Sequence, residues 1–188
     1  MNHQKSARRK TAAFMLLFAA AVIAMAAVTS VSVMRALYPI KYPEIVAVYS
    51  ERYSVDKELI YAVIKSESSF VPDAVSEAGA LGLMQIMPDT LDWLCGKTGE
   101  NLSFESLKEP DVSVRCGTFM LRLLLDEFGS EDTALAAYHA GRGRVNEWLA
   151  DDSVSPDGKT LDNIPFRDTA HYVSKVTRAK NIYRNLYD

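Results

Sequence analysis

The positions of hydrophobic and polar residues divide the chain into two parts. A first stretch, from Thr11 to Met34, contains no charged residue. Beyond it, apolar residues recur at intervals of three and four positions, which is the spacing of amphipathic helices. No Asn-Gly or Asp-Gly turn lies between alternating runs, as a β-hairpin would require. The pattern therefore predicts an all-α fold.

The ends of the expected helices coincide with residues that favour helix starts or stops. Asp56 fits an N-cap, Pro88 fits a first turn, and Gly129 and Gly141 fit stop positions. The polar residues 150–163 are expected to form a loop. The sequence thus predicts one helix that starts at Pro88 and others over residues 42–53, 57–66, 112–128, 132–140, 145–149 and 167–187.

The uncharged stretch is long enough to cross a membrane. As a helix it reaches about 36 Å, against a hydrocarbon core of about 30 Å. The basic residues between positions 5 and 10 would stay in the cytoplasm, with the rest of the chain outside. A cleaved signal peptide is the alternative, although its apolar region usually spans only about 7–15 residues. We expect a cytoplasmic tail over residues 1–10, a signal-anchor over 11–34, a linker over 35–42 and an outer domain over 43–188.

The charge of the chain indicates which kinds of molecule it can bind. The chain is 48% hydrophobic and 24% charged, as expected of one globular domain plus its first segment. All 24 acidic residues lie beyond residue 34, with 17 of the 21 basic ones, so that part has a net charge of −7. An acidic domain without a basic stripe is a poor nucleic-acid binder. We therefore expect no nucleic-acid partner.

Two cysteines, Cys95 and Cys116, lie in the expected outer domain. Their spacing matches no zinc pattern and no histidine lies near either, so we expect no metal and no cofactor. In an oxidising compartment the two would be able to form a disulfide. Two buried free thiols are the equal alternative, because sequence does not say whether the two are close.

Glu67 is the first candidate for chemistry. It ends the stretch LIYAVIKSE, whose apolar residues indicate a helix buried on nearly all sides. A carboxyl group at the C-terminal end of such a helix has its pKa raised by desolvation and by the helix dipole, as a general acid needs. The plainer interpretation is a good helix former at a helix end that reaches solvent.

Four segments together resemble the catalytic domain of soluble lytic transglycosylases, which belong to the lysozyme-like superfamily. They are ESSF at 67–70, GLMQIMP at 82–88, AYHAG at 137–141 and IPFRDTAHYV at 164–173. The resemblance covers roughly residues 43–187. It implies a lysozyme-like helical fold with a groove for glycan strands, and peptidoglycan as the substrate.

The resemblance also implies roles for individual residues. Glu67 would protonate the glycosidic oxygen and then accept the proton of the C6 hydroxyl of N-acetylmuramic acid, which closes a 1,6-anhydro ring. Each further residue has a structural alternative as well: a turn for the serine, a satisfied buried amide for the glutamine and core packing for a tyrosine. The implied substrate-binding residues are Ser76, Gln85, Tyr138, His139 and Tyr172, and the resemblance implies that the hydroxyl of Tyr172 lies near the catalytic carboxyl group.

The sequence departs from the family at two positions. His139 stands where the family usually has Asn, and Asp168 where it usually has Glu; neither is the main acid. A hydrolytic muramidase and a catalytically inactive glycan-binding module are the alternative functions. Hydrolysis would need a second carboxylate, for which Asp73, Glu77 and Asp168 are the candidates.

Overall fold

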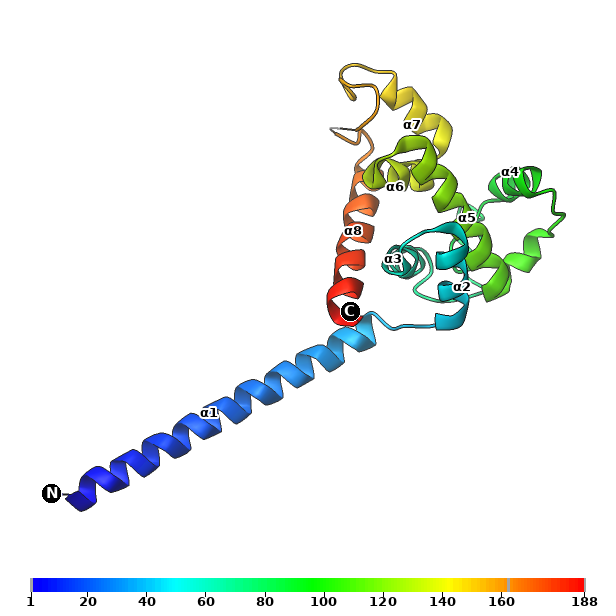
Figure 1. Ribbon diagram of the computed structural model, residues 1–188. Coiled ribbons are helices and arrows are strands. Elements are labelled where there is room, and N and C mark those ends of the chain that lie inside the picture. The colour runs from blue at the N-terminus through cyan, green and yellow to red at the C-terminus, as the bar shows by residue number, and fades with distance from the viewer. Residues whose placement is uncertain (1, 162, 188) are drawn as a thin grey trace. The chain divides into compact units, whose positions relative to one another are not determined.

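The structure is a computed structural model that describes residues 2–161 and 163–187, with side chains at 15, 17–26, 28–161 and 163–187 (Figure 1). It divides into two units, residues 1–39 and 40–188, which are described separately. Among the described residues there is no strand, and the only β-type pairings are isolated bridges from Leu81 to Val75 and to Ile86. The all-α prediction is confirmed.

The first unit is the helix α1, Asn2–Leu37. Its segment Leu17–Leu37 is long and apolar enough to cross a membrane by length and composition. Two polar side chains within it bond to the helix itself: Thr29 and Ser32 donate to the carbonyl oxygens of Met25 and Val28 at 2.8 and 2.9 Å. The helix therefore leaves these hydroxyl groups satisfied in apolar surroundings.

The second unit contains the remaining helices. The predicted ones are present within a few residues of their expected bounds, and a short 3₁₀ helix, η1, was not predicted. Five residues are too few for a helical period to show in sequence. The elements are α2 (Pro43–Tyr53), α3 (Lys57–Glu67), α4 (Pro88–Thr98), η1 (Phe104–Lys108), α5 (Pro110–Phe128), α6 (Glu131–Ala140), α7 (Arg142–Leu149) and α8 (Arg167–Tyr187).

Two helix starts differ in their chemistry from the prediction. Asp56 precedes α3 as expected but makes no side-chain capping bond; its carboxylate lies 3.1 Å from Nζ of Lys180 instead. Helix α6 begins one residue before Asp132, and the hydroxyl oxygen of Ser130 caps it by accepting from the backbone N–H of Thr133. The carboxylate of Asp56, which the local sequence pattern predicted to cap α3, therefore forms an ion pair with α8 instead.

Helix α3 is the centre of this unit. Its residues 59–64 are all buried, and it packs against α8 on one side and α2 on another (Figure 1). The ring of Tyr61 lies between those of Phe70 and Tyr183, with centroids 6.3 and 5.4 Å away. A helix held on several faces has little freedom to shift, so the position of its last residue, Glu67, is fixed by the core.

Candidate active site

The chain turns sharply directly after Glu67. Ser69 and Phe70 both adopt left-handed backbone conformations, with φ of 50° and 66°. This region is uncommon for non-glycine residues and is strained for a bulky one, at about 1–3 kcal/mol. The buried hydroxyl of Ser68 donates to the carbonyl oxygen of Leu83 at 2.8 Å and so ties the turn to the following loop. The turn leaves Glu67 partly buried at the end of α3.

Burial dominates the electrostatics of Glu67. Desolvation raises the pKa of its carboxyl group to about 7, although the hydrogen bond from Tyr172 and the charge of Lys175 both lower it. The hydroxyl of Tyr172 donates to Oε1 of Glu67 at 2.6 Å. The pKa of Tyr172 is raised well above its usual value by burial and by Glu67, so the phenol keeps the proton that it donates. Glu67 can therefore exchange a proton near neutral pH.

Lys175 was not predicted to take part in the site. Its ammonium group donates to the carbonyl oxygen of Ser66 at 2.9 Å, which brings a positive charge to the end of α3. The sequence would have allowed this prediction, because Lys175 follows Tyr172 by three positions and so lies on the same face of the helix.

The loop from residue 71 to residue 87 uses two of the predicted binding residues for its own shape. Both N–H groups of the Gln85 side chain are occupied, by the carbonyl oxygens of Ala74 and Gly82 at 2.9 and 2.8 Å. The hydroxyl oxygen of Ser76 accepts from the backbone N–H of Ala80 at 2.9 Å. A ligand can therefore use the carbonyl oxygen of the Gln85 side chain and the hydroxyl proton of Ser76.

Gly82 is needed where the loop meets the rest of the unit. Its φ is +86°, and a Cβ atom at this position would lie 2.2 Å from the carbonyl oxygen of Leu107. Any larger residue would therefore push the loop away from η1 and move the side chains that the loop presents.

Tyr138 and His139, adjacent on α6, have different surroundings. Tyr138 is buried, and its hydroxyl donates to the carbonyl oxygen of Met84 at 2.7 Å. His139 is exposed; its ring stacks on Tyr172 with centroids 4.5 Å apart, and its Nδ1 lies 3.2 Å from Oγ1 of Thr169. The structure thus brings His139, Tyr172 and Glu67 together, while Tyr138 supports the loop.

An open groove of about 460 Å³ extends from Tyr138 and His139 along α4 and α6. Trp93 lines it, a residue that was not among the binding candidates predicted from the sequence. Arg142 lines it too and is held by Glu127, whose carboxylate accepts from its Nε at 2.5 Å. The groove combines aromatic, apolar and charged side chains. Its lining consists of Met87, Asp89, Thr90, Trp93, Met120, Leu124, Tyr138, His139, Ala140, Gly141 and Arg142.

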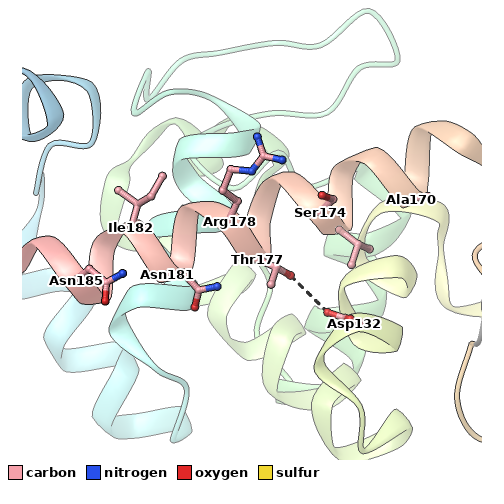
Figure 2. A pocket seen from close by; sticks show the side chains of 9 residues that line it. Asp132, Ala170, Ser174, Thr177, Arg178, Asn181, Ile182 and Asn185 are labelled. Carbon is pink, nitrogen blue, oxygen red and sulfur yellow. Dashed lines mark hydrogen bonds between the residues drawn. The ribbon is translucent and has the colours of Figure 1, made fainter.

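A second groove, of about 550 Å³, lies on the other face of α8 (Figure 2). Ser174 and Asn181 line it and are about half a turn around the helix from Tyr172, since successive residues are rotated by about 100°. Figure 2 shows Arg178 and Asn185 projecting from the same helix, and the hydroxyl of Thr177 donates to Asp132 at 3.4 Å. This groove is separate from Glu67.

The two cysteines are free thiols in the structure, so the disulfide interpretation is not realised there. Burial raises the pKa of Cys116 to about 11, which leaves its thiol protonated and unreactive. Both cysteines line one small cavity beside Tyr53 and Phe119. No group of three or more His, Cys, Asp and Glu side chains within the described residues could hold a metal ion.

The fold and the site define an all-α domain with a protonatable carboxyl group that is linked through Tyr172 to His139 in an open groove, an arrangement suited to general acid–base chemistry. The chain belongs to the Transglycosylase SLT domain family, which it matches over residues 44–160. The match confirms the resemblance to this family; it covers the first three of the four segments and ends before the fourth, residues 164–173. Tyr172, which the resemblance had already named, lies outside this match, and its place beside Glu67 comes from the geometry of the structure.

Two relatives and one solved structure illustrate the similarity. The soluble lytic murein transglycosylase of Salmonella typhimurium is 31% identical over 79% of this chain and 24% of its own length. The membrane-bound lytic murein transglycosylase C of Glaesserella parasuis is 31% identical over 78% of this chain and 46% of its own length. The lytic transglycosylase Slt of Pseudomonas aeruginosa, solved as an inactive Glu-to-Gln mutant, superposes with a TM-score of 0.67. It is 32% identical, and the match covers 79% of this chain and 25% of that one. The lysozyme-like fold expectation is confirmed, and the chain spans about a quarter of the length of the soluble relative.

Proposed function

We propose that this chain is a peptidoglycan lytic transglycosylase that cleaves the β-1,4 bond between N-acetylmuramic acid and N-acetylglucosamine without water. The observation that carries the proposal is the carboxyl group of Glu67, which has a pKa of about 7 and accepts a hydrogen bond from Tyr172. The ring of Tyr172 stacks on His139, which lines an open groove. Membership of the transglycosylase family and the names of its relatives support the substrate.

In the proposed reaction Glu67 acts twice. Its proton passes to the glycosidic oxygen while the bond from that oxygen to C1 of the muramic acid ring breaks. The C6 oxygen of the same ring then forms a bond to C1, and its proton returns to Glu67. The 1,6-anhydro product forms, the acid is regenerated and no water is consumed. A pKa near neutrality suits a group that must both give and take a proton.

The surroundings of Glu67 favour this reaction over hydrolysis. Inverting hydrolysis needs a second carboxylate to activate water, and retaining hydrolysis needs a carboxylate nucleophile. Asp73 and Glu77 are exposed in the loop after α3, and Asp168 is exposed in the first turn of α8. Such positions are the ordinary places for solvated turn residues and for an acidic residue that complements a helix dipole.

The test is a digest of purified peptidoglycan by the full chain in detergent, analysed by mass spectrometry. We expect muropeptides that end in 1,6-anhydro-N-acetylmuramic acid, lighter by one water than the hydrolytic products. Reducing ends in their place would identify a muramidase. Binding without cleavage would identify an inactive glycan-binding module. Glu67→Gln should abolish cleavage and leave the fold intact.

We also propose that α1 anchors the domain in the cell membrane as a single signal-anchor, with residues 1–10 in the cytoplasm and the domain outside. The support is the apolar segment Leu17–Leu37, the basic residues before it, and similarity to relatives named membrane-bound. In this arrangement the enzyme would act on peptidoglycan close to the bilayer.

A further inference from the structure

A chain of contacts leads from the exposed ring of His139 to Glu67. The imidazole stacks on the phenol ring of Tyr172 at 4.5 Å and an interplanar angle of 29°. The hydroxyl of that phenol donates to Oε1 of Glu67 at 2.6 Å. Thr169, which is buried, holds the other side of the imidazole at Nδ1. His139 is therefore linked to Glu67 through one aromatic ring, that of Tyr172.

His139 can gain a positive charge because it is exposed to solvent in the groove. Burial of part of its ring lowers its pKa from the usual 6.5, and Asp168 opposes this effect. At the upper end of the acidic range His139 is therefore neutral while Glu67 is still protonated. The titratable or charged groups that share its surroundings are Tyr138 on α6, Asp168 and Tyr172 on α8, Glu67 on α3, and Asp89 and Arg142 along the groove.

We propose that His139 is a positioning residue that sets the acidic limit of the pH range in which this enzyme works. The inference rests on the proposed function. When neutral, the imidazole packs on Tyr172 and leaves the bond from Tyr172 to Glu67 unchanged. The pH profile then has two limits of different origin: deprotonation of Glu67 on the basic side and protonation of His139 on the acidic side.

A protonated His139 would slow the reaction for two reasons. An imidazolium ion stacked on a phenol withdraws electron density from it, so the Tyr172 hydroxyl becomes a stronger donor to Glu67. The proton affinity of Glu67 then falls, which weakens its second role as a base. In addition, a positive charge beside the groove repels the oxocarbenium-like transition state of glycosidic cleavage.

The test compares initial rates of peptidoglycan cleavage between about pH 4 and pH 9 for three forms of the full chain in detergent. They are the wild type, His139→Asn, which has the amide of the resembled family, and His171→Asn. His171 is the other histidine of residues 40–188 and is exposed, so its replacement is the matched control. Each rate is divided by the maximum of the same form, which removes any loss of binding.

The wild type should fall to about a tenth of its maximum one pH unit below the pKa of His139. His139→Asn should keep its relative rate within about twofold at that pH and retain the basic limit, and His171→Asn should follow the wild type. An acidic limit that is unchanged in His139→Asn overturns the proposal.

NMR titration of the histidine ring resonances tests the coupling even if the chain cleaves nothing. His139 should show its own titration and a second, smaller step near pH 7 that reports Glu67. That second step should disappear in Glu67→Gln. Loss of cleavage with the second step present would overturn the proposed function alone. A His139 titration that is identical in the wild type and in Glu67→Gln overturns the coupling itself.

Discussion

Glu67 is a carboxyl group that the fold makes difficult to ionise. Its usual pKa is 4.5 and burial raises it to about 7, against Tyr172 and Lys175, which favour the ionised form. The protonated form of Glu67 is therefore more strongly favoured over the ionised form in the folded protein than in the unfolded chain. This difference predicts both a stability effect and an activity effect at the level of single residues.

Stability should depend on pH through Glu67. A group whose folded pKa is raised contributes stability that is full below its unfolded pKa, 4.5, and is lost as pH rises through about 7. The wild type should therefore become less stable than Glu67→Gln by up to about 3 kcal/mol between these values. Chemical denaturation of both forms at pH 4 and pH 8 measures this difference in the free energy of unfolding. A difference that is the same at both pH values would contradict the assignment.

The basic limit of activity should move when a group that favours the ionised form is removed. Tyr172→Phe deletes the hydrogen bond to Glu67, and Lys175→Met deletes the nearby charge. Each change should raise the pKa of Glu67, so cleavage should persist to higher pH while the maximal rate of Tyr172→Phe falls. Arg178→Met, on the other face of α8, is the control and should leave the limit in place. A limit that moves downward would mean that another group sets it.

At the level of elements, the contact of α5 with the loop after Glu67 depends on a helical glycine. A Cβ atom at Gly117 would lie 2.3 Å from Sδ and 2.6 Å from Cβ of Met84. Met84 is fixed at both ends, since its N–H donates to Ser113 and its carbonyl oxygen accepts from Tyr138. The loop therefore cannot easily yield to a larger residue.

Gly117→Ala should destabilise the protein by about 1–3 kcal/mol, although alanine is the better helix former. Gly96→Ala is the matched control within α4, because a Cβ there would meet no described heavy atom within 4 Å. That change should be neutral or stabilising by up to about 1 kcal/mol. Thermal and chemical unfolding of the two variants compare them directly, and equal effects would rule out the contact with Met84 as the cause.

The groove along α4 predicts a further binding contact. Trp93 lines it and is partly exposed, whereas Trp148 is buried against Phe166. In the Glu67→Gln background, N-acetylglucosamine-containing oligosaccharides should change the fluorescence of Trp93. Trp148→Phe should keep this response and Trp93→Phe should lose it. Trp93→Ala should weaken binding about three- to tenfold, as expected for one aromatic contact. A response that follows Trp148 would place the sugar elsewhere.

At the level of the whole molecule, the length of chain between α1 and the folded domain limits how far the domain can reach from the proposed membrane anchor. Helix α1 ends at Leu37 and α2 begins at Pro43, so the chain between them spans at most about 20 Å at about 3.3 Å per residue. We therefore expect the protein in the membrane fraction, released by detergent and retained in high salt. N-terminal sequencing of the mature protein is the second measurement. A soluble form that begins near Ala27 would make α1 a cleaved signal peptide.

The sequence predicted the helices and pointed to Glu67 as the candidate acid. Apolar spacing, Pro88 and Gly129 placed the elements to within a few residues, because these signals are local. The stretch before Glu67 also indicated a buried helix, since its apolar residues cover nearly every face. Local signals did not place η1, which is too short to show a period, or the partner of Asp56, which comes from a distant helix.

The tertiary structure alone decided how the site is assembled. Tyr172 and Glu67 are 105 positions apart, and only the packing of α8 on α3 brings their oxygens to 2.6 Å. The same packing places His139 on Tyr172, and the loop contacts assign the amide N–H groups of Gln85 to its own backbone. A pKa depends on desolvation and on neighbours in space, so the value of about 7 at Glu67 follows from the fold and from no motif.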